Sequence, residues 1–308
     1  MSPSSLHRRV DAPAMNILAS GVVALTLVLM TVSCSSRTFP NSGPAASCLE
    51  YKVGARGEPL GAVPGGSDLF TAPVWLFHHK LKLPLPVPLK AYVCSDEVAF
   101  ADKVDRIAGV GAYGDWRQPP TGVATEAGLI LRGDHLSRMD AAGCAGIIAH
   151  ELTHISHQTL AARRQDRAPS WILEGHAEVV RFRVLDLAGY RTYDQSRAEV
   201  LRSIGTSRRL PNLRALEKAK DWWVDSLPQS EAMYGVAFLA VEWLTERYGT
   251  AKLVEFLTRL RLGDADHREH WGKVFPIPYE YFLDEFSYRL KSLGRRDESP
   301  SNLVHVGT

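Results

Sequence analysis

Two histidines four positions apart, with a glutamate directly after the first, form the segment best suited to chemistry. Residues 150–154 are His-Glu-Leu-Thr-His. Positions i and i+4 share one face of an α-helix, so His150 and His154 project side by side and can hold one metal ion. Glu151 would stand beside that ion, where it can take a proton from a bound water. Residues 146–149 are apolar, and a cation would satisfy polar groups that are costly to bury there.

A catalytic zinc ion needs a third protein ligand and an open coordination position. The metzincin continuation, a glycine and a third histidine, is absent, and His157 is predicted to be exposed or to lie behind the ligands. An acidic ligand on the next helix is the other source. Glu174 lies twenty residues after His154, in an apolar setting, beyond a loop long enough to reverse the chain. His176 is a rival ligand, although it points away from the face that Glu174 shares with Glu178.

Glu178 lies one helical turn after Glu174 on the same face. If Glu174 binds the metal, Glu178 can accept a hydrogen bond from a ligand histidine and fix the tautomer of that ring. The alternative for Glu178 is a surface carboxylate with no part in the site.

The two segments together resemble the gluzincin peptidases. The sequence HELTH followed by PSWILEGHAE is similar to the peptidase-MA-like group, with its W-x-x-E-G-x-A-E segment. Looser similarity extends over residues 120–293, through 234–239 and 248–249 to the last helix. The resemblance implies a thermolysin-like zincin domain, Zn²⁺ as cofactor, and a peptide or protein substrate. It also implies a second donor to the oxyanion from a later helix, for which Tyr234 is the candidate; the alternative is a core aromatic.

The expected elements are strands first and helices afterwards, which places the chain in the α+β class. Residues 48–120 are strand-like and interrupted by Gly and Pro, with late helices beside the cleft and one metallopeptidase domain over residues 48–293. Residues 294–308 are predicted to be disordered. The predicted strands are 90–94 and 122–131, and the predicted helices are 97–107, 141–157, 170–187, 199–204, 229–248, a helix capped by Thr250 that ends near 262, and 278–293.

The N-terminus has the pattern of an export signal. Basic residues at 7–9 precede an uncharged apolar run, residues 17–32, which is short for a bilayer span and suits a signal peptide. The run ends at Cys34 and resembles a bacterial lipobox, with Thr31 as a departure from it. We therefore expect a signal over residues 1–34, lipidation of Cys34, a flexible tether over residues 35–47, and anchoring to a cell-envelope membrane. A cleaved secretory signal or an uncleaved anchor are the alternatives.

Three further cysteines leave at least one without an internal disulfide partner. Cys48 and Cys94 can form a bridge in an exported chain. Cys144 lies in an apolar helix and is expected to behave as a small buried hydrophobe.

Charge and the remaining polar clusters point to no nucleic-acid partner. The net charge is +2, from 36 basic and 34 acidic residues without a block of one sign. The arginines at 163, 164 and 167 are expected in a solvated loop, or alternatively near a substrate carboxylate. Trp222 and Trp223 either line the cleft or pack under a loop.

Two other functions fit the same segments. The protein can be a membrane-tethered domain with a structural zinc ion, or a zinc hydrolase of non-peptide amides or esters. Glu151 argues against the first, because a structural site has no use for a general base. The second shares its chemistry with a peptidase.

Overall fold

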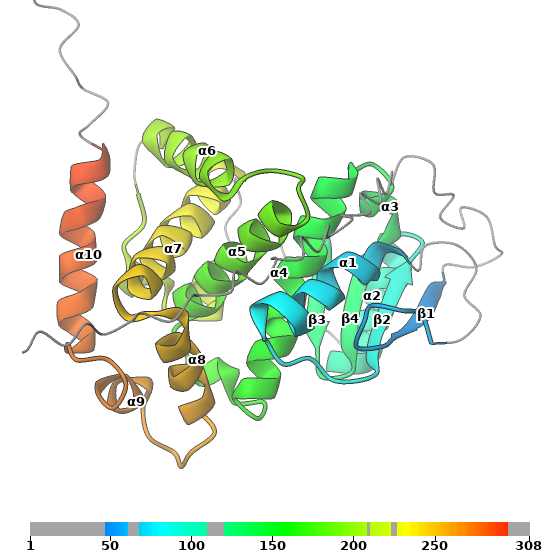
Figure 1. Ribbon diagram of the computed structural model, residues 1–308, viewed down its shortest axis with the longest axis horizontal. Coiled ribbons are helices and arrows are strands. Elements are labelled where there is room, and N and C mark those ends of the chain that lie inside the picture. Colours follow the sequence, from blue (N-terminus) through cyan, green and yellow to red (C-terminus); the bar gives the residue numbers. More distant parts are fainter. Residues whose placement is uncertain (1–46, 61–67, 110–119, 208–209, 223–226, 295–308) are drawn as a thin grey trace, which may run out of the picture. The chain divides into compact units, whose positions relative to one another are not determined.

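The computed structural model describes residues 47–60, 68–109, 120–207, 210–222 and 227–294, which form a small sheet and a larger set of helices (Figure 1). This mixed architecture confirms the α+β class. The predicted signal, Cys34, nearly all of the predicted tether, Trp223 and residues 295–308 lie outside the described residues. Among the described helices, none has the length and apolar character needed to cross a bilayer.

Four strands form one sheet in the order β1-β2-β4-β3, with β3 at one edge. β2 and β4 are parallel, whereas the β1–β2 and β3–β4 pairs are antiparallel. The predicted strand at 90–94 is confirmed as β2. The single strand predicted over 122–131 is wrong, because the chain reverses at residues 126–127 into β3 and β4. The strands are β1 Cys48–Val53, β2 Leu89–Cys94, β3 Gly122–Thr125 and β4 Gly128–Arg132.

Glycine at position 128 explains this reversal. Gly128 has a φ of 129°, and a β-carbon there would lie 2.2 Å from the carbonyl oxygen of Lys90 on β2. Only glycine tolerates both that conformation and that approach. At the other end of β2, the predicted Cys48–Cys94 disulfide is present and joins directly paired residues of β1 and β2. Cys144 is buried, as predicted.

Helices as well as strands occupy the N-terminal region, which corrects the strand-like expectation for residues 48–120. The helix α1 (Asp68–Leu76) contains Pro73, the kind of residue that argues against a helix in a sequence, and it continues into a π-helical turn, η2 (Phe77–Leu81). The predicted helix at 97–107 is confirmed as α2 (Glu97–Ala108), which packs on one face of the sheet. α1 and α4 (Ala141–Leu160) pack on the other face.

Three long helices carry the residues of interest, and the sequence predicted all three. α4, α5 (Ser170–Leu187) and α7 (Leu227–Tyr248) match the expected 141–157, 170–187 and 229–248. Asp140 caps α4 by accepting a hydrogen bond of 2.7 Å from the backbone N–H of Gly143. α5 packs between α4 and α7 and contacts both.

The remaining helices complete the second apolar core around α5 and α7. The helix predicted at 199–204 is α6, which begins earlier because Thr192 and Gln195 form a capping box. Thr250 is the first residue of α8, and Gly249 occupies the capping position instead. The other elements are α3 Gly133–Leu136, η3 Gln165–Arg167, α6 Tyr193–Thr206, η4 Leu213–Leu216, η5 Ala219–Trp222, α8 Thr250–Arg259, α9 His267–Gly272 and α10 Tyr279–Gly294.

Candidate metal centre

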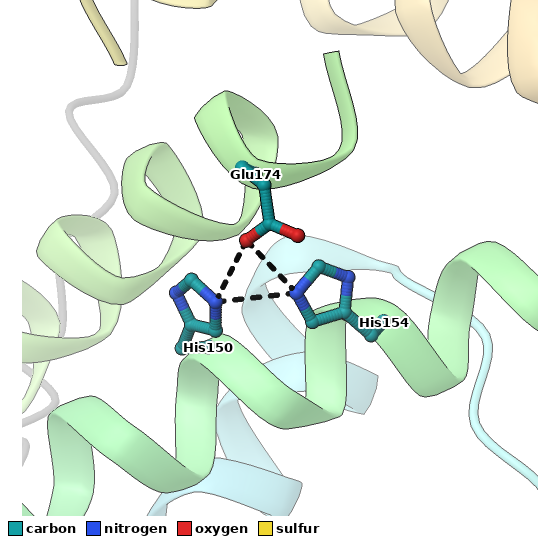
Figure 2. A group of neighbouring side chains, drawn as sticks. All are labelled: His150, His154 and Glu174. Carbon is teal, nitrogen blue, oxygen red and sulfur yellow. Dashed lines mark hydrogen bonds and ion pairs between the residues drawn. The ribbon is translucent and has the colours of Figure 1, made fainter. Parts of the chain in front are cut away.

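His150, His154 and Glu174 converge on one point between α4 and α5. Figure 2 shows the two imidazoles projecting from successive turns of α4 toward the carboxylate from α5. His150 Nε2 lies 3.2 Å from His154 Nε2, and Glu174 Oε2 lies 3.3 Å and 3.4 Å from the two nitrogens. Ligand atoms at about 2.0–2.1 Å from a tetrahedral zinc ion are separated by roughly 3.3 Å. The three side chains therefore have the spacing and chemistry of a His₂Glu zinc site.

The triangle remains accessible, as a catalytic site requires. The side chains of His150, His154 and Glu174 are 12%, 20% and 22% exposed. Burial lowers the pKa of His150, but hydrogen bonds to Glu174 and Glu178 outweigh it and raise this pKa to about 10. Burial raises the pKa of Glu174, but the charge of His154 and bonds to both imidazoles outweigh it and lower this pKa. The cluster thus favours positive charge at its centre, which a bound cation supplies.

Glu178 makes the contact that its position on α5 suggested. Its Oε1 lies 2.9 Å from Nδ1 of His150, and its side chain is buried. An ionised carboxylate can only accept a hydrogen bond, so Nδ1 of His150 carries a proton, and Nε2 is the nitrogen that a metal ion would bind in place of its own proton.

Glu151 lies between the triangle and the edge strand β3. The backbone N–H of Ala124 donates a hydrogen bond to its carboxylate, and burial raises its pKa despite the opposing charges of His150 and His154. A β-carbon on Gly122 would lie 2.8 Å from Cγ of Glu151, so the strand approaches this closely only because residue 122 is glycine. Gly122 and Ala124 belong to the site, and no pattern in the sequence marks them.

Tyr234, on the first half of α7, lies beside the triangle. Its ring centroid is 5.9 Å from that of His150 and 5.1 Å from that of Trp222. Burial, followed by the charge of Glu174, raises the pKa of Tyr234 well above its ordinary value, so its hydroxyl keeps its proton. Trp222 packs under the site, and its Nε1 donates to the carbonyl of Leu216 at 3.2 Å.

His157 and His176 form a buried pair, so of the two positions expected for His157, exposed or behind the ligands, the second is the one observed. His157 Nε2 lies 2.9 Å from His176 Nδ1, and both side chains are buried. The His157 ring also contacts His154, with centroids 5.5 Å apart, so it lies behind that residue. His176 faces His157 and is not one of the three converging ligands.

The arginines between α4 and α5 lie at the surface, as expected of a solvated loop, and they also pair with neighbouring loops. Arg163 donates to Glu126 on the β3–β4 turn at 2.8 Å. Arg164 donates to the carbonyl of Gly263 at 2.7 Å, and Arg167 donates to Asp264 at 2.8 Å. These contacts hold the connection that brings α5 back against α4.

Comparison with protein-family models, with curated proteins and with solved structures finds no match to this chain.

Proposed function

We propose that the protein is a zinc-dependent peptidase of the gluzincin type, with a thermolysin-like active site. His150, His154 and Glu174 would bind the zinc ion, and Glu151 would act as general base. The observation that supports this most is the triangle of ligand atoms with edges of 3.2–3.4 Å and a second carboxylate, that of Glu151, beside it. A structural zinc site has no need of that carboxylate, whereas hydrolysis requires a base.

Each residue then has a separate task. Zinc, when bound, lowers the pKa of water and polarises a carbonyl group. Glu151 takes the proton of the attacking water and passes it to the leaving amine, since its raised pKa makes it a stronger base than an ordinary glutamate. Tyr234, which stays protonated, donates a hydrogen bond to the oxyanion from the α7 side. Glu178 keeps His150 in the tautomer that can bind the metal.

The edge strand supports a peptide as substrate. β3 pairs with β4 on one side, and its outer edge faces Glu151 through Gly122 and Ala124. An extended peptide can add to such an edge by exchanging its main-chain hydrogen bonds for those that Ala124 makes to the side chains of Glu151 and Gln158, which places the peptide backbone beside the catalytic base. A small non-peptide amide would not need this strand.

The experiment is metal analysis of the purified chain, with a peptide-library digest of wild type beside Glu151→Gln. We expect about one zinc ion per chain in both proteins. Activity should fall by about two to four orders of magnitude in Glu151→Gln, the usual range for loss of a positioned general base. Glu255→Gln, an exposed change on α8, is the control and should behave as wild type. Wild type purified without chelator that carries no transition metal would contradict the proposal. Cleavage of amide or ester reporters without any peptide cleavage would point to the non-peptide hydrolase.

A further inference from the structure

The carboxylate of Glu178 has two partners. Oε1 lies 2.9 Å from His150 Nδ1, and Nη1 of Arg181 donates to Oε1 at 3.2 Å and to Oε2 at 3.3 Å. Glu174, Glu178 and Arg181 occupy positions i, i+4 and i+7 of α5, so all three face α4. The contacts run in one line from the guanidinium through the carboxylate to a proposed zinc ligand.

The guanidinium is held in place by α4 itself. A β-carbon on Gly146 would lie 3.1 Å from Nε of Arg181 and 3.6 Å from its Cγ, so the side chain lies directly on this glycine. Nε is buried, whereas the side chain as a whole is 34% exposed. Glycine inside a helix is less favourable than alanine, and Gly146 lies one turn before His150. Alanine at position 146 would give a more stable helix, but glycine leaves room for Arg181 where its side chain crosses α4.

Glu178 needs such a partner, because its side chain is 8% exposed. A buried carboxylate is costly unless its oxygens are hydrogen-bonded, and Arg181 donates to both of them. Both Arg181 contacts also fix the plane of the carboxylate, and therefore the direction from which Oε1 meets His150.

We propose that Arg181 is a positioning residue of the metal centre, which fixes the orientation of Glu178 so that Glu178 in turn aligns His150 for zinc. The proposal rests on the proposed function, since it presumes that the triangle binds zinc. Arg181 itself touches neither metal nor substrate.

Zinc affinity of the full chain, measured by competition with a chromophoric chelator at fixed pH, tests this inference. Loss of a group that supports a ligand from outside the site lowers metal affinity about 10–100-fold, and we expect this range for Arg181→Met. Arg181→Lys retains the charge but not the two-point contact, so its affinity should lie between wild type and Arg181→Met. Arg183→Met is the matched control on the same helix. Arg183 is exposed and lies over the Tyr193 ring at 4.0 Å, and its loss should leave zinc affinity unchanged.

A double-mutant cycle separates positioning from a general effect on folding. In a Glu178→Gln background, Arg181→Met should change zinc affinity by no more than about twofold, because the residue through which it acts is already altered. An equal loss in both backgrounds would overturn the proposal, as would wild-type affinity in Arg181→Met. If Arg181→Met does not fold, the same cycle with Arg181→Lys decides the question. Wild type that fails to bind zinc at all would instead contradict the proposed function.

Discussion

The interface between α4 and α5 contains two histidine clusters of opposite character. In the first, His150 and His154 meet the carboxylates of Glu174 and Glu178. In the second, about one turn further along α4, His157 meets only another histidine. Both clusters lie between the same helices, so helix packing alone does not distinguish them.

The carboxylates make the difference. Hydrogen bonds to Glu174 and Glu178 raise the pKa of His150 to about 10 in spite of burial. Burial and nearby imidazoles lower the pKa of His157 well below its usual range, and burial with the charge of His154 lowers that of His176 to about 4. The first cluster therefore attracts positive charge, and the second excludes it. Burial of histidines is common to both clusters, and only the proposed metal site adds carboxylates to them.

The largest expected difference is in zinc affinity, when one histidine from each cluster is replaced by asparagine and the two variants are compared. Structural zinc sites bind with about 10–16 kcal/mol spread over their ligands, so His154→Asn should weaken zinc binding about 100-fold or more. His157→Asn, three positions along the same helix, should change zinc affinity by no more than about threefold. It should instead lower the free energy of unfolding by about 1–2 kcal/mol, because His176 loses its partner. Chelator competition and urea unfolding measure the two effects. An equal decrease in zinc affinity in the two variants would contradict the distinction between the clusters.

An intermediate loss of stability and of zinc affinity is expected when Gly175 is replaced. This residue lies between Glu174 of the first cluster and His176 of the second. A β-carbon at this position would lie 2.2 Å from the carbonyl oxygen of Ala237 on α7. Gly175→Ala should therefore push α5 away from α7 and lower the free energy of unfolding by roughly 1–3 kcal/mol. Zinc affinity should fall as well, since Glu174 moves with the same turn. Gly272→Ala is the control, because no heavy atom lies within 4 Å of its β-carbon position. Denaturation with and without zinc measures both quantities, and wild-type behaviour of Gly175→Ala would show that the helices are not packed this closely.

Per pH unit, the smallest effect is on stability. In the chelator-treated protein, the free energy of unfolding should depend on pH with opposite signs for the two clusters. His176 has a folded pKa of about 4, so between about pH 6.5 and 4 the unfolded chain binds a proton that the native chain does not. Its contribution to stability is thus lost as the pH falls through this window. His150 has a folded pKa of about 10, so its contribution is present below about pH 6.5 and is lost as the pH rises toward 10.

Replacing each histidine by asparagine should flatten one side of the stability–pH curve. His176→Asn should reduce the acid slope by up to about 1.4 kcal/mol per pH unit, and His150→Asn should reduce the alkaline slope. Measurement between pH 6.5 and 5 keeps the acid side clear of ordinary glutamates, which titrate near about 4.3. Urea unfolding at each pH provides the data. If His176→Asn flattened the alkaline side instead, the assignment of charge to the two clusters would be reversed.

The sequence predicted much of the site because its signals are local. The i, i+4 spacing of His150 and His154 places them together on any helix, and long apolar runs ended by Gly or Pro predicted α4, α5 and α7. Glu174 and Glu178 followed from the same periodicity. Local signals also misled: Pro73 concealed α1, and a run of β-forming residues concealed the turn between β3 and β4.

By itself, the sequence determined the three long helices α4, α5 and α7, which of their faces carry imidazoles and carboxylates, and that Cys48 can pair with Cys94. Tertiary structure alone decided which of those groups meet. The burial of His157 against His176, the approach of Gly122 to Glu151 and the passage of Arg181 over Gly146 each join residues of different elements. Such contacts depend on the distances at which helices and strands pack. Those distances are set by the summed volume of many side chains at each interface, and no spacing within one segment encodes that sum.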